Sequence, residues 1–123
     1  MVDFSVLIPN LGYSSFLFDC IDSIIKQTNT SGYTVEIILC DQSDEECYLR
    51  IAQECVEKYG NKVNIYHSEI KSLYRARHFL MSKTSGKYIV FVDSDDFFIN
   101  GFLDHIHLYF LKNPNVDILI KKQ

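Results

Sequence analysis

Short apolar runs alternate with segments of helical periodicity along this chain. The runs are rich in strand-forming residues and cover residues 4–8, 35–40, 63–67 and 88–92. After each run, apolar residues recur three or four positions apart, which predicts a helix with one buried face. The pattern therefore predicts an α/β fold in which strands and helices alternate.

Four helices are expected between and after these runs. The first begins near Ser14 or Ser15, and the second is capped by Ser43 or Asp44. A last strand is expected over residues 116–120. The residues predicted to form the buried helical faces are Leu17, Ile21, Ile24 and Ile25; Tyr48, Ala52, Cys55, Val56 and Tyr59; Leu73, Ala76 and Leu80; and Ile99, Leu103, Ile106 and Phe110.

The fourth run is the most uniformly apolar, so we expect helices to cover both of its faces, as they do for parallel strands. The chain has 123 residues, which is enough for one domain with its own core. The expected fold is a Rossmann-like three-layer α/β sandwich around a mostly parallel sheet. No apolar run approaches the ~18 residues of a membrane span, and the N-terminus lacks the pattern of a secretory signal.

Charge narrows the classes of partner. The net charge of −4 argues against nucleic-acid binding, which needs an excess of Lys and Arg. Residues 70–92 nevertheless hold no acidic residue, and Asp93, Asp95 and Asp96 follow at once. Adjacent blocks of opposite charge suit an anionic ligand that needs a metal ion. The alternative is a solvated basic helix face beside an acidic turn, and for Lys71 we favour that interpretation.

The four cysteines indicate packing rather than metal or redox chemistry. They are Cys20, Cys40, Cys47 and Cys55, and they form no Cys-x-x-Cys pair. No His stands at metal-ligand spacing from them. We therefore expect reduced thiols in a cytoplasmic protein.

The residues that follow the predicted strands are the candidates for a site, because open α/β sheets bind ligands beyond the carboxyl ends of their strands. Asp41 follows the second strand, and Asp93, Ser94 and Asp95 follow the fourth. In an extended segment Asp93 and Asp95 would point the same way and reach one cation. Their hard oxygen ligands suit Mg²⁺ or Mn²⁺, which could neutralise a diphosphate leaving group.

Four motifs stand in a fixed order along the chain. The first spans residues 5–12 together with 23–28, and the others span residues 36–43, 76–79 and 86–96. The last reads Gly-Lys-Tyr-Ile-Val-Phe-Val-Asp-Ser-Asp-Asp. Together they resemble the N-terminal half of a family 2 glycosyltransferase of the GT-A fold, and four motifs in order are far more specific than any one of them.

The resemblance implies a site for a nucleotide-diphosphate sugar. Asp41 would hydrogen-bond the uracil or other base, and Asp95 would bind Mg²⁺ or Mn²⁺ on the diphosphate. The residues implied around the nucleotide sugar are Pro9, Leu11, Asp41, Arg77, Asp93 and Ser94, and the implied metal ligands are Asp95 and Asp93.

The resemblance also implies that residues 1–123 are the donor-binding part of a longer enzyme. Family members carry a second half that binds the acceptor, so the general base is expected beyond Gln123 and this part alone is expected to be inactive. The donor would be a UDP-sugar. The acceptor would be a polysaccharide or a lipid-linked saccharide, with the parent protein at the inner face of the membrane.

Several other classes of protein share parts of this pattern. A non-catalytic nucleotide-binding or assembly module of the same fold is the main alternative. A receiver-like signalling domain would need an acidic pair after the first strand and an Asp after the third, where Pro9-Asn10 and His67-Ser68 stand instead. A phosphatase of the Asp-x-Asp type would also need its aspartates after the first strand. A dinucleotide-binding domain would need a Gly-x-Gly-x-x-Gly turn, which the sequence lacks.

Overall fold

The computed structural model describes residues 2–28 and 32–116 of the chain. In this part of the chain, strands and helices alternate as predicted, and the strand expected over residues 116–120 lies outside it except for Val116. No helix among the described residues combines the length and the apolar composition needed to cross a membrane. The elements are β1 (Phe4–Asn10), α1 (Ser15–Thr28), β2 (Val35–Asp41), α2 (Glu45–Tyr59), η1 (Gly60–Lys62), β3 (Val63–His67), α3 (Leu73–Ser82), β4 (Tyr88–Phe91) and α4 (Phe102–Lys112).

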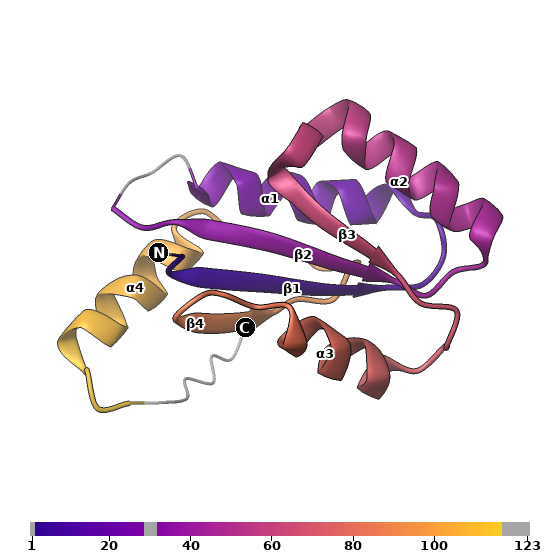
Figure 1. The fold of residues 1–123 in the computed structure, drawn as a ribbon. Coiled ribbons are helices and arrows are strands. Elements are labelled where there is room, and N and C mark those ends of the chain that lie inside the picture. Colours follow the sequence, from indigo (N-terminus) through magenta and orange to yellow (C-terminus); the bar gives the residue numbers. More distant parts are fainter. Residues whose placement is uncertain (1, 29–31, 117–123) are drawn as a thin grey trace.

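The four strands form one parallel sheet in the order β3-β2-β1-β4 (Figure 1). All seven residues of β1 are buried at the centre of this sheet. Asn10, the last residue of β1, pairs in register with Asp41, the last residue of β2. Because the strands all run the same way, their carboxyl ends meet at one edge, where a ligand site is expected.

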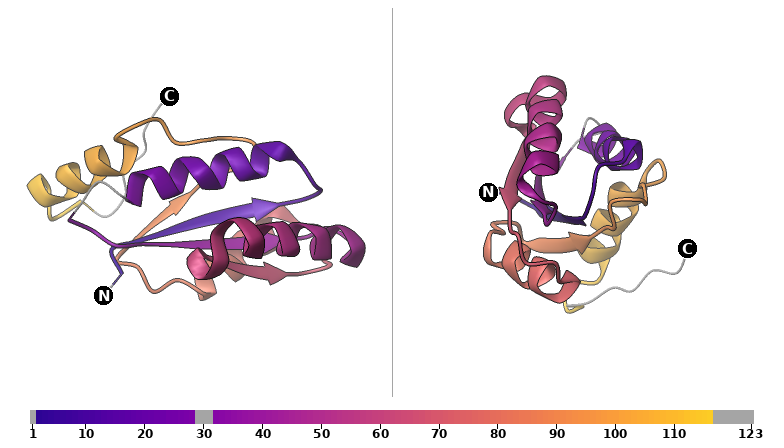
Figure 2. Two further views of the ribbon diagram at one scale, coloured as in Figure 1. Left: turned by 90° about the horizontal axis from the view of Figure 1, so that it is seen from above. Right: turned by 90° about the vertical axis from the view of Figure 1, so that its right-hand side faces the viewer.

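Helices cover the two faces of the sheet and complete three layers (Figure 2). On one face, α1, α2 and α4 pack around a core that includes Phe4 and Ile8 of β1. On the other face, Ala76 and Leu80 of α3 pack against Leu7. The predicted three-layer α/β sandwich is therefore confirmed.

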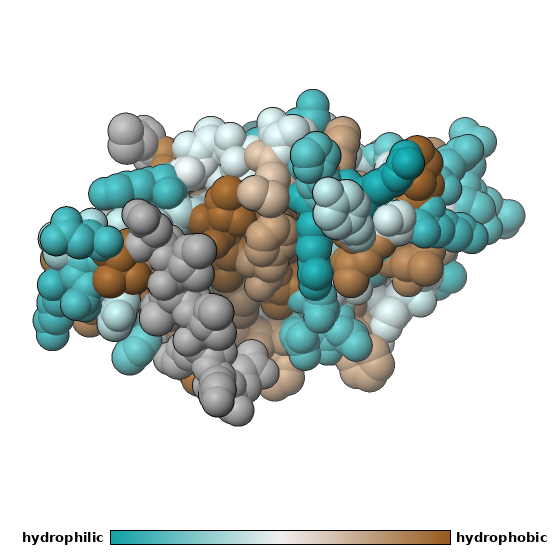
Figure 3. All heavy atoms as spheres, turned by 90° about the horizontal axis from the view of Figure 1, so that it is seen from below, coloured by the Kyte–Doolittle hydropathy of each residue, from teal (hydrophilic) through white to brown (hydrophobic). Residues whose placement is uncertain are grey.

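Strand β4 departs from the expected burial. Tyr88 stacks on Phe110 of α4 with ring centroids 4.2 Å apart, but Ile89 and Phe91 on the opposite face are 40% and 43% exposed. β4 is an edge strand of the described sheet beside β1, and α3 packs on β1 and β2. The prediction that helices cover both faces of residues 88–92 is wrong for the described residues. Figure 3, which views the molecule from the side of the sheet where α3 lies, shows hydrophobic residues at the surface.

Helix α2 begins where its capping residue predicts, and its predicted buried face is confirmed in part. The side chain of Asp44 accepts a hydrogen bond from Cys47 N at 2.9 Å, as expected of an N-cap. Val56, predicted to be buried, is 62% exposed. Apolar residues lie on two faces of this helix, so the periodicity does not decide which face meets the sheet. Cys55 and Tyr59 are buried as predicted, and Ile51 is buried although the pattern did not include it.

The cysteines pack as the sequence predicts. Cys20, Cys40 and Cys55 are buried, Cys47 is half-buried, and all four are free thiols. Burial raises the pKa of Cys40 and of Cys55 to about 11, so both thiols stay protonated at neutral pH.

Gly86 sits where β4 begins beside β1. A Cβ on this residue would lie 2.6 Å from Ser5 N and 2.9 Å from the carbonyl carbon of Phe4. The Gly86 N–H donates to Ser5 Oγ at 2.8 Å. The close approach of two backbones explains why the fourth motif opens on glycine.

Glu36 on β2 makes a pH-sensitive contact at the same place. Its carboxylate accepts hydrogen bonds from Ser5 Oγ, from Ser85 N at 2.6 Å and from Ser85 Oγ at 3.0 Å. Burial raises the pKa of this carboxyl, but the hydrogen bonds outweigh burial and hold the pKa below its ordinary value of 4.5. A carboxyl with a lowered folded-state pKa adds stability above its unfolded-state pKa. That stability is lost as the pH falls through the folded-state pKa.

Glu36→Gln is therefore expected to make the free energy of unfolding depend less on pH in the acidic range. The wild-type chain should lose more free energy of unfolding than the variant between about pH 6 and about pH 3, because only the wild type has this carboxylate to protonate. Urea unfolding at the two pH values measures the difference. Glu57→Gln makes the same substitution on the exposed side of α2 and is the matched control for the change in net charge. Equal slopes for wild type and Glu36→Gln would contradict the assignment.

Candidate functional site

A cleft of about 420 Å³ opens at the carboxyl edge of the sheet. The end of β1 and the turn after it form its first wall, and the segment that leads into α3 forms its second wall. The turn after β4 also lines it. The volume is in the range of small-molecule sites, and the place is the one where open α/β sheets bind ligands. The lining residues are Pro9, Asn10, Leu11, Ser14, Phe16, Gln42, Lys71, Ser72, Leu73, Asp93, Ser94 and Asp95.

A buried polar network fixes the turn after β1. Asp41 is fully buried, and its carboxylate accepts hydrogen bonds from Asn10 Nδ2 at 2.8 Å, Ser43 Oγ at 2.8 Å and Ser43 N at 3.2 Å. Asn10 Nδ2 also donates to Gly12 O at 3.0 Å, and Gly12 N donates to Ser43 Oγ at 2.7 Å. The Asp41 carboxylate thus holds the first wall of the cleft and is not itself part of the lining.

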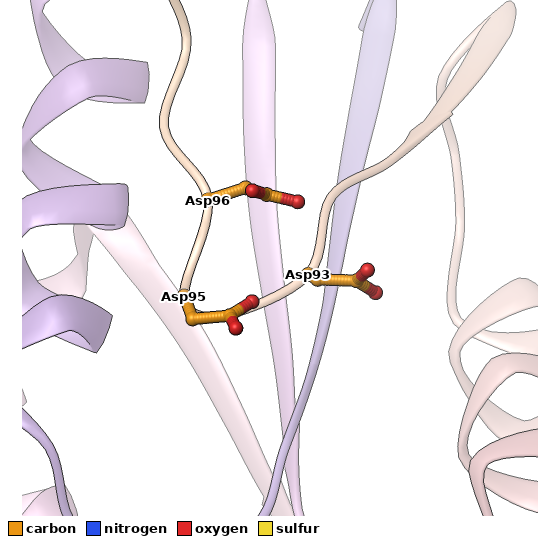
Figure 4. A group of neighbouring side chains, drawn as sticks. All are labelled: Asp93, Asp95 and Asp96. Atoms are coloured by element: carbon orange, nitrogen blue, oxygen red, sulfur yellow. The ribbon is translucent and has the colours of Figure 1, made fainter.

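The turn after β4 brings three carboxylates together. Asp93, Asp95 and Asp96 are exposed, and each offers an oxygen within 4.8 Å of the others. Figure 4 shows the side chains of Asp95 and Asp96 extending into the turn and that of Asp93 extending from its other limb. Asp96 N donates to Asp93 O at 3.0 Å, so the segment is a turn and not the extended strand that the sequence analysis assumed. The turn brings in Asp96 as well as the predicted pair.

This acidic turn fits a divalent cation. Carboxylate oxygens are the hard ligands that Mg²⁺ and Mn²⁺ prefer, and exposed positions leave room for water and phosphate oxygens to complete the coordination shell. Asp93 and Asp95 also line the cleft. A cation held by them would therefore face a ligand bound there.

Cys20 of α1 packs beneath the acidic turn. Its thiol donates to Asp93 O at 3.7 Å. Burial first, and then the carboxylates of Asp96, Asp95 and Asp93, raise the pKa of the thiol to about 12. The thiol therefore remains a protonated donor and adds no negative charge to the turn.

Two polar residues of α1 hold the chain that follows the acidic turn. Ser23 Oγ accepts a hydrogen bond from Phe98 N at 2.9 Å. Gln27 Nε2 donates to Ile99 O at 2.6 Å, and its Oε1 accepts from Leu103 N at 3.0 Å. These contacts give a structural reason for Ser23 and Gln27 in the first motif, because they tie the chain after the acidic turn to α1.

Arg77 of α3 lies next to the acidic turn. Its Nη2 is 3.7 Å from Asp93 Oδ1, with the two side chains 45% and 56% exposed. Its guanidinium carbon is 5.9 Å from the centre of the Phe91 ring. Arg77 is outside the cleft lining, but its partner Asp93 is in it. A positive charge therefore stands beside the acidic turn.

The structure brings most of the predicted site residues together. Asp41 lies behind the first wall, and Arg77 lies beside the acidic turn. The predicted residues that line the cleft are Pro9, Leu11, Asp93, Ser94 and Asp95.

Sequence patterns alone do not single out the second wall. Lys71 lines the cleft, although the sequence favours an ordinary surface role for it, and Gln42 lines it too. One signal points to this wall: Ser72 caps α3, where its hydroxyl accepts from Arg75 N at 3.3 Å. A helix that starts at Leu73 places the preceding residues at the carboxyl edge of the sheet.

The fold and the site define a class of protein, a Rossmann-like α/β domain with an acidic turn at the carboxyl edge of a parallel sheet. Comparison with known sequences gives the family. The sequence model of glycosyl transferase family 2 matches residues 5–121. The chain belongs to this family, and the resemblance found in its motifs is confirmed.

Curated relatives are named for sugar transfer or polymer biosynthesis. The minor teichoic acid biosynthesis protein GgaB of Bacillus subtilis is 29% identical over 119 residues, which cover 95% of this chain and 13% of that protein. The poly(ribitol-phosphate) beta-N-acetylglucosaminyltransferase TarS of Staphylococcus aureus is 28% identical over 101 residues, which cover 79% of this chain and 17% of that protein. The chain thus spans only a small part of the length of these relatives.

Solved structures share the fold. TarS 1–349 of S. aureus in complex with UDP-GlcNAc has a TM-score of 0.74 at 20% identity, covering 90% of this chain and 32% of that one. GalNAc-T7 with UDP, GalNAc and Mn²⁺ has a TM-score of 0.63 at 24% identity, covering 76% of this chain and 18% of that one. These similarities confirm the expected fold class.

Proposed function

We propose that this chain is the donor-binding part of a glycosyltransferase and binds a nucleotide-diphosphate sugar through Mg²⁺ or Mn²⁺. The observation that carries the proposal is the acidic turn of Asp93, Asp95 and Asp96 beside a cleft of about 420 Å³ in a family 2 chain. A diphosphate and a carboxylate cluster repel each other unless a cation stands between them, so the metal joins the two.

The solved structures of similar fold support a UDP-linked donor. One holds UDP-GlcNAc, and another holds UDP and GalNAc with Mn²⁺. We therefore take a UDP-sugar as the donor and a divalent cation as its companion in this chain.

The lining residues take separate parts in the proposed complex. Pro9 and Leu11 border the base and ribose from the end of β1 and the turn after it. Asp93 and Ser94 lie by the ribose and the diphosphate, and Asp95 joins Asp93 in binding the metal.

Asp41 and Arg77 act from outside the cleft lining in this proposal. The Asp41 carboxylate already accepts three hydrogen bonds, so it supports the base through the turn that it holds. Arg77 lies 3.7 Å from Asp93 and adds positive charge near the diphosphate.

The proposed reaction is a displacement at the anomeric carbon of the sugar. The bond from this carbon to the diphosphate breaks, a bond to the acceptor oxygen forms, and a base takes the proton of the acceptor hydroxyl. A bound divalent cation offsets the charge that develops on the leaving diphosphate. The carboxylates that line the cleft, Asp93 and Asp95, are assigned to the metal. We therefore propose that the base comes from the rest of the protein.

The proposed acceptor is a polysaccharide or a lipid-linked saccharide. Support comes from the relatives, since GgaB is named for minor teichoic acid biosynthesis and TarS for transfer to poly(ribitol-phosphate). The cytoplasmic location stays a prediction from the sequence.

Backbone amide shifts of the ¹⁵N-labelled chain test the proposed site. With UDP and Mg²⁺ we expect the shifts to change at the cleft residues in 10–16, at Gln42 and in residues 71–73 and 93–95. With Mn²⁺ in place of Mg²⁺, the signals of residues 93–96 should broaden first, because the ion is paramagnetic and lies among their carboxylates. Metal-independent shifts, or shifts centred elsewhere, would count against the proposal. Sugar transfer by the full-length protein would separate an enzyme from a non-catalytic module.

A further inference from the structure

Gln42 connects the end of β2 to the second wall of the cleft. The residue is only 5% exposed, and it lines the cleft. Its Nε2 donates to Ser72 O at 2.8 Å and also to Ile70 O. A side-chain amide has two N–H hydrogens, so both are used on the segment that leads into α3.

The segment before α3 has little regular structure apart from these contacts. Ser72 N donates to Ile70 O at 3.0 Å, and Ala76 N donates to Ser72 O at 2.9 Å as α3 begins. These bonds are local and shape the turn without fixing its distance from the sheet. Ser68 N donates to Asp41 O at 2.9 Å and ties the start of the segment to the end of β2. The side chain of Gln42 holds the stretch further along, which includes Lys71 and Ser72 of the cleft wall.

The backbone of Gln42 reaches the first wall at the same time. Its N–H donates to Asn10 O at 2.9 Å, at the residue where β1 ends and the turn that contains Leu11 begins. One residue is therefore bonded to both sides of the cleft, through its backbone on one side and its side chain on the other.

We propose that Gln42 is a positioning residue that sets the width of the donor cleft by holding residues 70–72 with its side-chain amide. The inference rests on the proposed function, because it concerns the same cleft. A wall already in place does not have to be ordered when the ligand binds, which strengthens binding. If the wall kept this arrangement only one-tenth of the time without the amide, the apparent affinity would fall about tenfold.

The chemistry of the two carbonyl acceptors makes the proposal testable by small substitutions. Gln42→Glu keeps the length of the side chain and its acceptor oxygen but removes both donors. Gln42→Met also removes the donors and leaves the net charge unchanged. Gln53→Glu makes the same chemical change on the exposed side of α2 and serves as the control.

Two measurements are made on each variant of the full chain. Calorimetric titration with UDP and Mn²⁺ is expected to show an affinity at least about tenfold lower for both Gln42 variants, and unchanged for Gln53→Glu. Hydrogen exchange of the ligand-free chain is expected to speed up at the amides of residues 72–76 in the Gln42 variants only. If Gln42→Glu does not unfold cooperatively, Gln42→Met carries the test.

The outcomes separate this inference from the function on which it rests. A wild-type chain that does not bind UDP with Mn²⁺ overturns both. A wild-type chain that binds, with both Gln42 variants within about twofold of it, overturns the positioning role alone. A loss of affinity with unchanged exchange at residues 72–76 also overturns it, because Gln42 would then act by touching the nucleotide itself.

Discussion

Asp95→Asn is expected to weaken UDP binding in the presence of Mn²⁺ by at least about 100-fold. Losing a group that only hydrogen-bonds a metal ligand costs roughly 10–100-fold in metal affinity, and Asp95 is proposed to bind the metal directly. Asparagine keeps the shape and one oxygen but removes the negative charge that attracts the cation. Calorimetric titration of wild type and variant with UDP at a fixed Mn²⁺ concentration measures the loss.

The matched control for this prediction is Asp19→Asn. Asp19 is exposed on α1 and is not part of the cleft lining, and its substitution removes the same charge. It is expected to leave the affinity within about twofold of wild type. Equal losses for the two variants would mean that overall charge, and not coordination, governs binding. An unchanged affinity of Asp95→Asn would remove Asp95 from the metal site.

Asp41→Ala is expected to cost about 3–5 kcal/mol of folding stability, because it removes a fully buried carboxylate that accepts three hydrogen bonds. The substitution leaves Asn10 Nδ2 and the Ser43 donors with one partner fewer in a buried place, and it opens a small cavity. The turn after β1 loses its anchor, so UDP binding should fall as well. Urea unfolding followed by circular dichroism measures the stability.

Asp44→Ala is the control, because it makes the same substitution three residues further along. Asp44 is exposed, and its carboxylate caps α2 through one hydrogen bond from Cys47 N. Loss of such a cap costs about 1 kcal/mol. If Asp41→Ala costs no more than Asp44→Ala, the buried network does not hold the site as described.

The strands and helices could be predicted because their signals are local. Residues 35–40 are a mostly apolar run, and Asp44 is a capping residue ahead of a helix, so both elements follow from neighbours in the sequence. The burial of β4 could not be predicted in the same way. Ile89 and Phe91 are as apolar as any strand residue, and their exposure depends on where α3 packs, which is a long-range property. The exposure of Val56 on α2 could not be predicted for the same reason.

Some residues of the candidate site could likewise be predicted from the sequence, and others could not. The acidic residues after β4 are visible in sequence because they follow an apolar strand, and the motif order identifies the family. The contact of Gln42 with Ser72 and the place of Lys71 in the cleft depend on the path of the chain between β3 and α3. The periodicity of apolar residues does not predict this path. Asp41 is visible in sequence as a carboxylate at the end of a strand. Its burial beneath Asn10 and Ser43 emerges only from the register of β1 and β2.

The central claim is that this cleft binds a nucleotide diphosphate through a divalent cation at the acidic turn. Calorimetric titration of the 123-residue chain with UDP, once with Mn²⁺ and once with EDTA, tests it most directly. The account predicts saturable binding at one site with Mn²⁺, and binding at least about tenfold weaker with EDTA. Equal binding under the two conditions, or no binding with Mn²⁺, would contradict it.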